Sequence, residues 1–285
     1  ELSFLRQSGF FVRLVPAVIM SSSLQRTVSR VLGASCRRVQ HSNDILELLA
    51  QDGSCVVPVG SASEVVAQRL HSSIFGDQLK ATSRPKKLTH HLSALYGKPR
   101  TEWFPPHTDG TRFGPSYPDY FSLLCEKACS RGGGENFFVD AYAILDAFLA
   151  EPELSWVPAA LQVHSVDQCS RLEPRLSPVV LTARDGRRAV RCRVDGLNDS
   201  VVQRVPSESA HVAKEREMLA FFHAAVIACS INAPRFLIDA GELLLVDNYR
   251  MIHGRDAFHS EDRLMWGTCI WTTSAIDTPE DTSTA

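Results

Sequence analysis

The sequence predicts a single, mainly β domain with flanking helices, arranged as a double-sheet jelly roll. Three observations predict it. Many short β-prone runs follow one another with little helix between them, one segment alone (207–231) has the spacing of a long helix, and no internal repeat divides the chain. Hydrophobic residues make up 44% and charged residues 22% of the 285 residues, so a sizeable core can form.

The first predicted elements are a buried strand at 54–60 and a helix at 63–71. Ser63 is a suitable N-cap, because its hydroxyl can accept a hydrogen bond from a free N–H of the first turn. Polar residues and prolines over 78–106 predict an ordered loop, in which the pair His90 and His91 is interpreted as exposed. Further along, the alternation and spacing of apolar residues predict strands over 120–128 and 136–140 and a short helix over 141–149.

The second half continues with a strand at 161–166 and a hairpin at 178–194. Asp185 and Gly186 occupy the turn of that hairpin, a dipeptide typical of tight β-turns. The long helix at 207–231 carries an apolar stripe near the 3.6-residue period. Four final strands are expected at 236–238, 243–246, 251–253 and 264–271.

The charge balance excludes a broad class of partner. Lys and Arg number 30 against 32 Asp and Glu, a formal net charge of −2, whereas a nucleic-acid binder normally carries a clustered basic excess. No apolar run reaches the roughly 18 residues that a membrane-spanning helix needs. We therefore expect neither nucleic acid nor a membrane as partner, and the sequence does not indicate an oligomeric state.

Cysteine usage and the N-terminus bear on compartment and domain division. Eight cysteines without a CxxC pair predict reduced thiols and a cytoplasmic location. The first 43 residues carry six arginines against one acid, a bias that is also typical of an organelle transit peptide. We expect three parts: a partly disordered leader or added extension at 1–43, a single jelly-roll domain at 44–276, and a polar C-terminal tail at 277–285.

Two segments far apart in the chain carry residues with metal-binding chemistry. His107 and Asp109 are separated by one residue, so in an extended segment both side chains point to the same face and Thr108 points away. His253 follows an apolar, β-prone run. Two imidazoles and one carboxylate form the facial set that binds Fe(II) and leaves coordination positions open. The alternative for each histidine alone is a buried side chain that bonds to a backbone carbonyl.

Arg263 opens the apolar strand that follows His253. A turn through 254–262 can bring this strand back beside His253, which would place a guanidinium in the same cavity. The fixed fork of guanidinium donors matches a carboxylate with two hydrogen bonds. The alternative is a surface arginine at the start of a strand.

These motifs together resemble a known family. His107-Thr-Asp109, the glycine-rich turn 131–135 with Asn136, the block from Asp247 to His253, and Arg263 occur in the order found in the iron(II)/2-oxoglutarate dioxygenases of the taurine dioxygenase and clavaminate synthase (TauD/TfdA-like) superfamily. The resemblance covers roughly residues 50–275. It implies a double-stranded β-helix (cupin-like) core and the use of Fe(II), 2-oxoglutarate and O2.

The resemblance also implies roles for particular residues. His107, Asp109 and His253 would bind iron, Arg263 would hold the distal carboxylate of 2-oxoglutarate, and Asn136 stands where the family often has a Thr or Ser that contacts this co-substrate. Sulfonate-oxidising members have a second arginine four residues after the first; this chain has Gly267 there, which argues against a sulfonate substrate. Halogenating relatives lack the metal carboxylate, which is present here as Asp109.

The expected activity is oxidation, chiefly hydroxylation, of an aliphatic C–H of a small molecule such as an amino acid or specialised metabolite, with release of succinate and CO2. Desaturation, epoxidation and cyclisation use the same chemistry and stay open, as does a catalytically inactive metal-binding jelly roll. An oxidase without 2-oxoglutarate is disfavoured by Arg263. Candidate substrate residues are Arg112 and Tyr117 on a loop, Arg193 and Asp195 on a strand, and Arg255. The alternative is a solvated strand for Arg193 and Asp195, and a structural role for Arg255.

Overall fold

The computed structural model describes most of the chain beyond residue 20. The described residues are 21–31, 34–39, 44–89, 102–110, 113–114, 116–163, 165–167, 176–194 and 210–280. The helices are α2 (Ser22–Arg30), α3 (Ile45–Asp52), α4 (Glu64–Phe75), α5 (Ala141–Leu149), α6 (Val157–Val163) and α8 (Ala210–Asn232), with a 3-10 turn η3 (Gly76–Gln78) after α4.

Strands make up the rest of the regular structure among the described residues. They are β1 (Arg37–Arg38), β2 (Ser54–Pro58), β3 (Leu79–Thr82), β4 (Lys86–Leu88), β5 (Phe104–His107), β6 (Tyr120–Lys127), β7 (Asn136–Asp140), β8 (Ser165–Asp167), β9 (Leu176–Pro178), β10 (Val180–Thr182), β11 (Arg188–Val190), β12 (Glu242–Asp247), β13 (Met251–Arg255) and β14 (Leu264–Thr272).

Two sheets build the core. The larger has the order β1-β2-β12-β6-β14-β3, with β4 also paired to β14, and the smaller has the order β5-β13-β7. Their facing sides share an apolar cluster that includes Phe121, Val246 and Met265 from the larger sheet and Phe138 and Met251 from the smaller. The core is therefore the double-sheet jelly roll that the sequence predicts.

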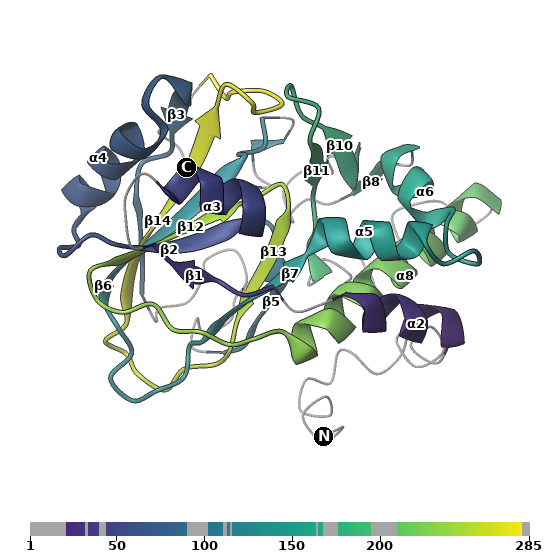
Figure 1. The fold of residues 1–285 in the computed structure, drawn as a ribbon, viewed down its shortest axis with the longest axis horizontal. Coiled ribbons are helices and arrows are strands. Elements are labelled where there is room, and N and C mark those ends of the chain that lie inside the picture. Colours follow the sequence, from purple (N-terminus) through teal and green to yellow (C-terminus); the bar gives the residue numbers. More distant parts are fainter. Residues whose placement is uncertain are drawn as a thin grey trace.

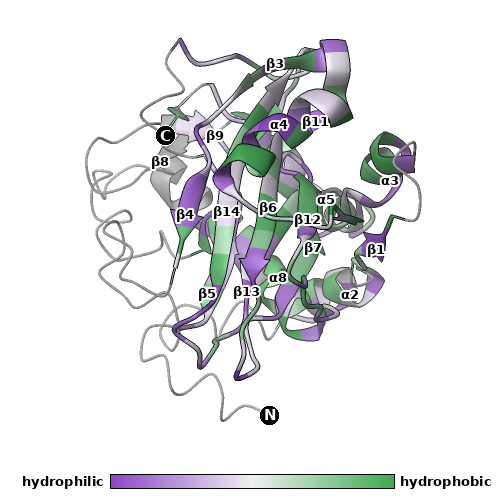
Figure 2. Cartoon of the chain, turned by 90° about the vertical axis from the view of Figure 1, so that its left-hand side faces the viewer, coloured by the Kyte–Doolittle hydropathy of each residue, from purple (hydrophilic) through white to green (hydrophobic). Residues whose placement is uncertain are grey.

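Helices cover the outer faces of both sheets, as Figure 1 shows. Apolar residues of α3 and α4 pack with Leu124 and Leu245 on the outer face of the larger sheet. On the opposite side, α2, α5, α6 and α8 form a layer whose apolar cluster includes Val139 and Ile252 of the smaller sheet. Figure 2 shows apolar residues along the central strand β6 and hydrophilic ones on β4, which joins the sheet at β14. The result is a four-layer arrangement in which the small sheet is buried between the large sheet and the helices.

Local sequence signals account for several element boundaries. The Ser63 hydroxyl accepts a hydrogen bond from the Val66 N–H at the start of α4, which confirms the predicted cap. Asp140 caps α5 in the same way, accepting from the N–H groups of Tyr142 and Ala143. Strands β6, β7, β12, β13 and β14, the hairpin β10–β11 and the long helix α8 lie where the sequence predicts them.

Three sequence-based predictions of local structure were wrong. Residues 78–106 contain β3, β4 and β5, not only a loop, because β3 and β4 are short and polar on their exposed side, as edge strands commonly are. Leu161 belongs to α6, whose buried Val157, Ala160 and Leu161 have helical spacing. The segment 236–238 contributes a single bridge from Phe236 rather than a strand. His90 and His91 lie outside the described residues.

Part of the predicted leader packs on the domain. Leu24 of α2 is buried in the helical layer, and the Arg26 guanidinium contacts the Glu151 carboxylate at 2.6 Å. Strand β1 pairs in parallel with β2 at the edge of the larger sheet. Residues 22–30 and 37–38 therefore belong to the folded structure, because their apolar and backbone groups find partners there.

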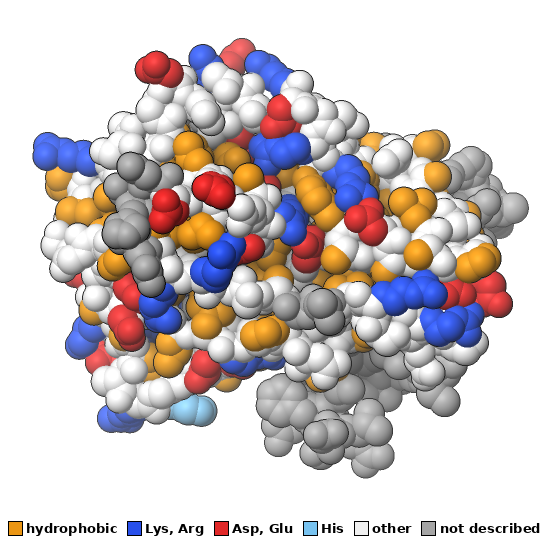
Figure 3. Space-filling model, in the orientation of Figure 1, with side chains coloured by type: hydrophobic (Ala, Val, Ile, Leu, Met, Phe, Trp, Pro, Cys, Tyr) orange, Lys and Arg blue, Asp and Glu red, His pale blue; other side chains and the backbone are white. Residues whose placement is uncertain are grey.

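The surface agrees with the near-neutral net charge. Figure 3 shows basic and acidic side chains interspersed over the displayed face, with hydrophobic side chains scattered between them. Within the described part of the chain, no helix is both long and apolar enough to cross a membrane. The seven cysteines of the described residues are all free thiols.

Candidate functional site

The predicted metal-binding residues converge at one end of the small sheet. His253 on β13 and His107 on β5 are directly paired across the two strands, and their ring centroids lie 4.4 Å apart. Asp109 follows two residues after the end of β5. One ligand atom from each of the three residues lies within 4.8 Å of the others. We call these three residues the His–Asp–His cluster.

Each imidazole is oriented by the backbone carbonyl of the residue two positions before it. His107 Nδ1 lies 2.9 Å from the carbonyl oxygen of Pro105, and His253 Nδ1 lies 3.4 Å from that of Met251. A carbonyl oxygen only accepts, so each Nδ1 carries the proton and each Nε2 presents its lone pair. These Nε2 atoms lie 3.7 Å and 3.5 Å from the two carboxylate oxygens of Asp109.

Aromatic rings form the walls around the imidazoles. The Phe121 ring stacks on His253 with centroids 5.3 Å apart and planes 4° from parallel. The Phe104 ring meets His107 edge-on at 4.5 Å. These contacts restrict the rotation of both imidazoles and exclude water from one side of the cluster. Neither phenylalanine is marked by any sequence motif, so sequence reasoning missed them.

The ionisation states suit a cation. Burial by itself would raise the pKa of Asp109, but its interactions with His107 and His253 outweigh burial and hold that pKa well below its usual range. Burial and the neighbouring His107 lower the pKa of His253. An ionised carboxylate and a neutral imidazole are the forms in which these side chains bind metal. The buried His253 Nε2 has no hydrogen-bond partner among the described residues, so this donor set fits a divalent transition metal.

The chain turns sharply after Asp109. Gly110 has a φ of +88°, and a Cβ on it would lie 2.3 Å from the Pro118 ring. A residue with a side chain would strain the backbone and collide with that proline. Thr108 points away from the cluster and accepts a hydrogen bond from the Cys192 N–H at 3.0 Å, as the alternation of a strand predicts.

Asn136 and Arg263 both lie near the glycine-rich turn 131–135. Asn136 is the first residue of β7, directly after the turn, and Arg263 lies beside Gly134 within it. Asn136 is buried, and its Nδ2 has no hydrogen-bond partner among the described residues. The Arg263 guanidinium lies 5.3 Å from the Phe258 ring, and its Nε lies 3.6 Å from where a Cβ of Gly134 would stand. Asn136 pairs with Arg255 across β7 and β13, on the same face as the pair His253 and Phe138.

The candidate substrate residues have different environments in the structure. Arg193 forms a β-bridge directly opposite His107, so its side chain starts on the same face as the His–Asp–His cluster. Arg255 is buried, and its guanidinium donates to the carbonyl oxygens of Glu102 and Asp256. Tyr117 is fully buried, and its hydroxyl lies 3.3 Å from the carbonyl oxygens of residues 190 and 248, which leaves no surface for a substrate. Arg112 and Asp195 lie outside the described residues.

Comparisons with known proteins agree with this geometry. The family described as "Taurine catabolism dioxygenase TauD, TfdA family" matches residues 37–269. None of the curated proteins matches the chain.

Solved structures of similar fold include three oxygenases. An asparagine oxygenase in complex with Fe(II), a hydroxyasparagine and succinate is 14% identical over 84% of this chain and 85% of its own, with a TM-score of 0.56. The non-heme iron oxygenase OrfP, in complex with Fe and alpha-ketoglutaric acid, is 14% identical over 94% and 88%, with a TM-score of 0.53. A putative alpha-ketoglutarate-dependent taurine dioxygenase from Burkholderia xenovorans is 13% identical over 86% and 89%, with a TM-score of 0.56.

Proposed function

This chain belongs to the taurine catabolism dioxygenase TauD, TfdA family and is a 2-oxoglutarate-dependent oxygenase that uses Fe(II), 2-oxoglutarate and O2; on that premise we propose that it hydroxylates an aliphatic C–H of an amino acid or a close derivative. Succinate and CO2 are the co-products. The observation that carries the proposal is the convergence of two inward-facing imidazole Nε2 atoms and the Asp109 carboxylate within 4.8 Å.

Each part of the site has an assigned task in this proposal. His107, Asp109 and His253 hold the iron, which supplies O2 activation when bound. Three protein ligands on one side leave room for a chelating co-substrate and for O2. Phe121 and Phe104 keep the imidazoles in place and exclude water, which protects a reactive centre from side reactions.

The co-substrate site is assigned to Asn136 and Arg263. The buried Nδ2 of Asn136 can donate a hydrogen bond to an oxygen anion, and the Arg263 guanidinium can bind a carboxylate with two parallel hydrogen bonds. Asn136 directly follows the glycine-rich turn, and the Arg263 Nε lies 3.6 Å from where a Cβ of Gly134 in that turn would stand. Substitution Arg263→Ala should raise the 2-oxoglutarate concentration required for turnover, and an unchanged requirement would remove Arg263 from this role.

Arg193 supports an amino acid as substrate. Its backbone bridge to His107 starts the Arg193 side chain on the face of the His–Asp–His cluster, and a guanidinium on that face can bind the carboxylate of a substrate whose side chain reaches the iron. The asparagine oxygenase of similar fold was solved with a hydroxyasparagine. A sulfonate is disfavoured, because this chain has Gly267 where sulfonate-oxidising relatives have a second arginine. The surroundings leave no room for such a side chain, since a Cβ on Gly267 would already lie 3.0 Å from Leu88. The free thiols of the described residues support a cytoplasmic location.

The decisive experiment has two stages. Anaerobic addition of Fe(II) and then 2-oxoglutarate to the full chain should produce a weak visible charge-transfer band. Succinate is then measured in air across amino acids and their derivatives, with Arg193→Met as the matched variant. We expect succinate formation with particular amino acids and a raised KM for them in Arg193→Met, with the 2-oxoglutarate requirement unchanged.

Three outcomes would contradict parts of this proposal. If neither the band nor succinate appears, the proposed oxygenase reaction is wrong. If succinate appears but the isolated product is desaturated or cyclised, hydroxylation is wrong while the enzyme class stands. If Arg193→Met leaves the KM for the amino acid unchanged, the carboxylate-binding role of Arg193 is wrong.

A further inference from the structure

Asn248 lies in the turn between β12 and β13 and touches the backbone of Asp109. It is fully buried, five residues before His253. Its side-chain Oδ1 accepts a hydrogen bond from the Asp109 N–H at 2.9 Å, and its Nδ2 donates to the Asp109 carbonyl oxygen at 3.0 Å. The same Nδ2 donates to the Pro118 carbonyl oxygen at 2.9 Å. One carboxamide therefore satisfies three backbone groups on either side of the loop that follows β5.

The two hydrogen bonds from Asn248 to Asp109 take the place of a hydrogen-bonded residue pair between neighbouring strands. The pairing of β5 with β13 reaches His107 and His253, so ladder hydrogen bonds hold both imidazole-bearing residues. Asp109 is two residues beyond the end of β5, at a bend where the ladder has stopped. An amide side chain that accepts from the N–H and donates to the C=O of one residue acts like a neighbouring strand. Asn248 thus gives Asp109 the order that the two histidines receive from the sheet.

The same turn also holds the far end of this loop. The Asn248 N–H donates to the Asp119 carbonyl oxygen at 2.9 Å, and the Tyr249 hydroxyl donates to the Tyr117 carbonyl oxygen at 2.9 Å. Tyr117 and Tyr249 stack with their centroids 5.5 Å apart. Both ends of the segment between Asp109 and Asp119 are therefore attached to the turn between β12 and β13.

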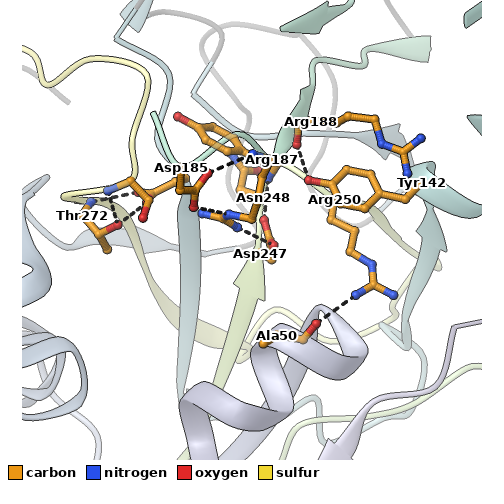
Figure 4. A network of polar contacts seen from close by, with 12 residues as sticks. Ala50, Tyr142, Asp185, Arg187, Arg188, Asp247, Asn248, Arg250 and Thr272 are labelled. Atoms are coloured by element: carbon orange, nitrogen blue, oxygen red, sulfur yellow. Dashed lines mark hydrogen bonds and ion pairs between the residues drawn. The ribbon is translucent and has the colours of Figure 1, made fainter. Parts of the chain in front are cut away.

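An ion-pair cluster in turn fixes the position of Asn248. We call Asp185, Arg187 and Asp247 the arginine cluster. Arg187 contacts both carboxylates, with Nη1 2.8 Å from Asp247 Oδ2, and the other Asp247 oxygen accepts from the Tyr249 N–H at 3.0 Å. Figure 4 shows Asn248 next to this cluster, with Arg250 reaching from the same turn to the end of α3. The turn is anchored before and after Asn248.

We propose that Asn248 is a positioning residue for the Asp109 carboxylate, acting through the Asp109 backbone. The inference rests on the proposed function, in which Asp109 binds the iron. A carboxylate on a short side chain reaches a metal only if its Cα is held within a few tenths of an ångström, because Asp has just two rotatable side-chain bonds. Residues that orient metal ligands typically contribute about 10- to 100-fold to metal affinity.

The test compares Asn248→Ala with Thr272→Val in the full chain. Thr272 bonds to Asp119 in the same buried network but does not touch Asp109, so Thr272→Val removes a buried hydrogen bond of the same region without affecting the ligand. Fe(II) binding is titrated anaerobically by calorimetry, without 2-oxoglutarate or substrate. The melting temperature of the metal-free chain is measured in parallel. We expect Asn248→Ala to raise the Kd for Fe(II) at least about tenfold. Thr272→Val should lower the melting temperature and leave the Kd unchanged.

A second readout follows the backbone directly. Amide hydrogen exchange of the metal-free protein should show the Asp109 N–H protected in the wild type and in Thr272→Val, and unprotected in Asn248→Ala. If Asn248→Ala does not fold, Asn248→Ser replaces it, since serine leaves a smaller gap and retains a polar group. The serine hydroxyl is too short to reach both Asp109 groups, so the same loss of affinity is expected.

The outcomes separate this inference from the proposed function. If the wild type itself binds no Fe(II), the proposed function is wrong. If the wild type binds Fe(II) and the Asn248 variant binds it equally well, the positioning role is wrong and the proposed function stands. An equal loss of Fe(II) affinity in Asn248→Ala and Thr272→Val would show that general destabilisation accounts for the effect, and it would also overturn the positioning role.

Discussion

The His–Asp–His cluster and the arginine cluster lie at the two ends of one short stretch of chain, from Asp247 to His253, and they treat their carboxylates in opposite ways. Asp247 has a guanidinium 2.8 Å away, yet burial raises its pKa to about 6. Asp109 has only two imidazoles within ion-pair distance among the described residues, yet its pKa is held below the usual range.

This difference separates a functional from a structural use of charged side chains. In the arginine cluster, one guanidinium of the chain itself contacts two of its carboxylates, so the cluster connects the hairpin β10–β11 to the turn after β12. In the His–Asp–His cluster, the groups present are all donors of lone pairs. Such a set is completed by a cation from outside the chain, which is why we assign function to one cluster and stability to the other.

The largest effect is expected at Asp109. Asp109→Ala should abolish Fe(II) binding and succinate formation, because one of three protein ligands is lost. Its melting temperature should stay close to that of the wild type, since the carboxylate has no guanidinium or ammonium partner among the described residues. Calorimetric titration of Fe(II) and thermal unfolding measure the two quantities. Retained turnover would refute the assignment of Asp109 as a ligand.

Arg187→Met should show the reverse pattern. Removing the guanidinium leaves the buried Asp247 without its ion-pair partner, which should lower the free energy of unfolding by about 3 kcal/mol, the low end for breaking a buried pair. The Kd for Fe(II) should change far less than in Asp109→Ala. Urea denaturation gives the stability. A variant as stable as the wild type would show that the arginine cluster contributes nothing net.

The pH dependence of Asp247 gives the next effect. Its pKa is raised in the folded state from 3.8 to about 6, so between these values the folded chain binds more protons than the unfolded chain. Stability from this group is therefore present below about pH 4 and is lost as the pH rises through 6. Two pKa units correspond to about 3 kcal/mol, and we expect somewhat less, about 2 kcal/mol.

The measurement isolates Asp247 from other carboxylates by difference. The free energy of unfolding is determined for the wild type and for Asp247→Asn from pH 4 to pH 7. The variant should gain stability relative to the wild type as the pH rises, because asparagine does not ionise. A constant difference across this range would mean that Asp247 titrates at its ordinary pKa.

Arg250→Ala should have the smallest effect of the four. Arg250 contacts Asp140 at 2.7 Å and two backbone carbonyls at the end of α3. Its loss should cost about 1.5 kcal/mol, because Asp140 keeps the N–H groups of α5 as partners. Chemical denaturation measures this change. A loss as large as that of Arg187→Met would contradict the argument that the remaining partners of the carboxylate decide the cost.

Much of the fold follows from short-range patterns. The alternation over 120–128, the apolar run over 264–271, the Ser63 cap and the Asp185–Gly186 turn each depend on residues only a few positions apart, so sequence alone indicates them. The short edge strands β3 and β4 escaped prediction because a strand with one exposed side needs few apolar residues. Helix α2 escaped because its burial depends on a layer formed by residues more than one hundred positions later.

The candidate site divides in the same way. The spacing of His107 and Asp109 places both on one face, and the resemblance of later motifs supplies His253, Arg263 and Asn136. Tyr117 follows the metal pair closely in sequence, yet the structure buries it completely. Its neighbours Asn248 and Tyr249 belong to a distant segment, so no local pattern could reveal that burial.

The sequence by itself determined the chemistry of this protein: which side chains can bind a metal or a carboxylate, and on which face of a strand each one lies. Only the tertiary structure decided which backbone groups hold those side chains in place. Asn248 and Asp109 stand 139 residues apart, and their hydrogen bonds exist because the turn after β12 packs against the end of β5. Side-chain alternation is set by the geometry of neighbouring peptide units, whereas such pairings depend on the path of the whole chain.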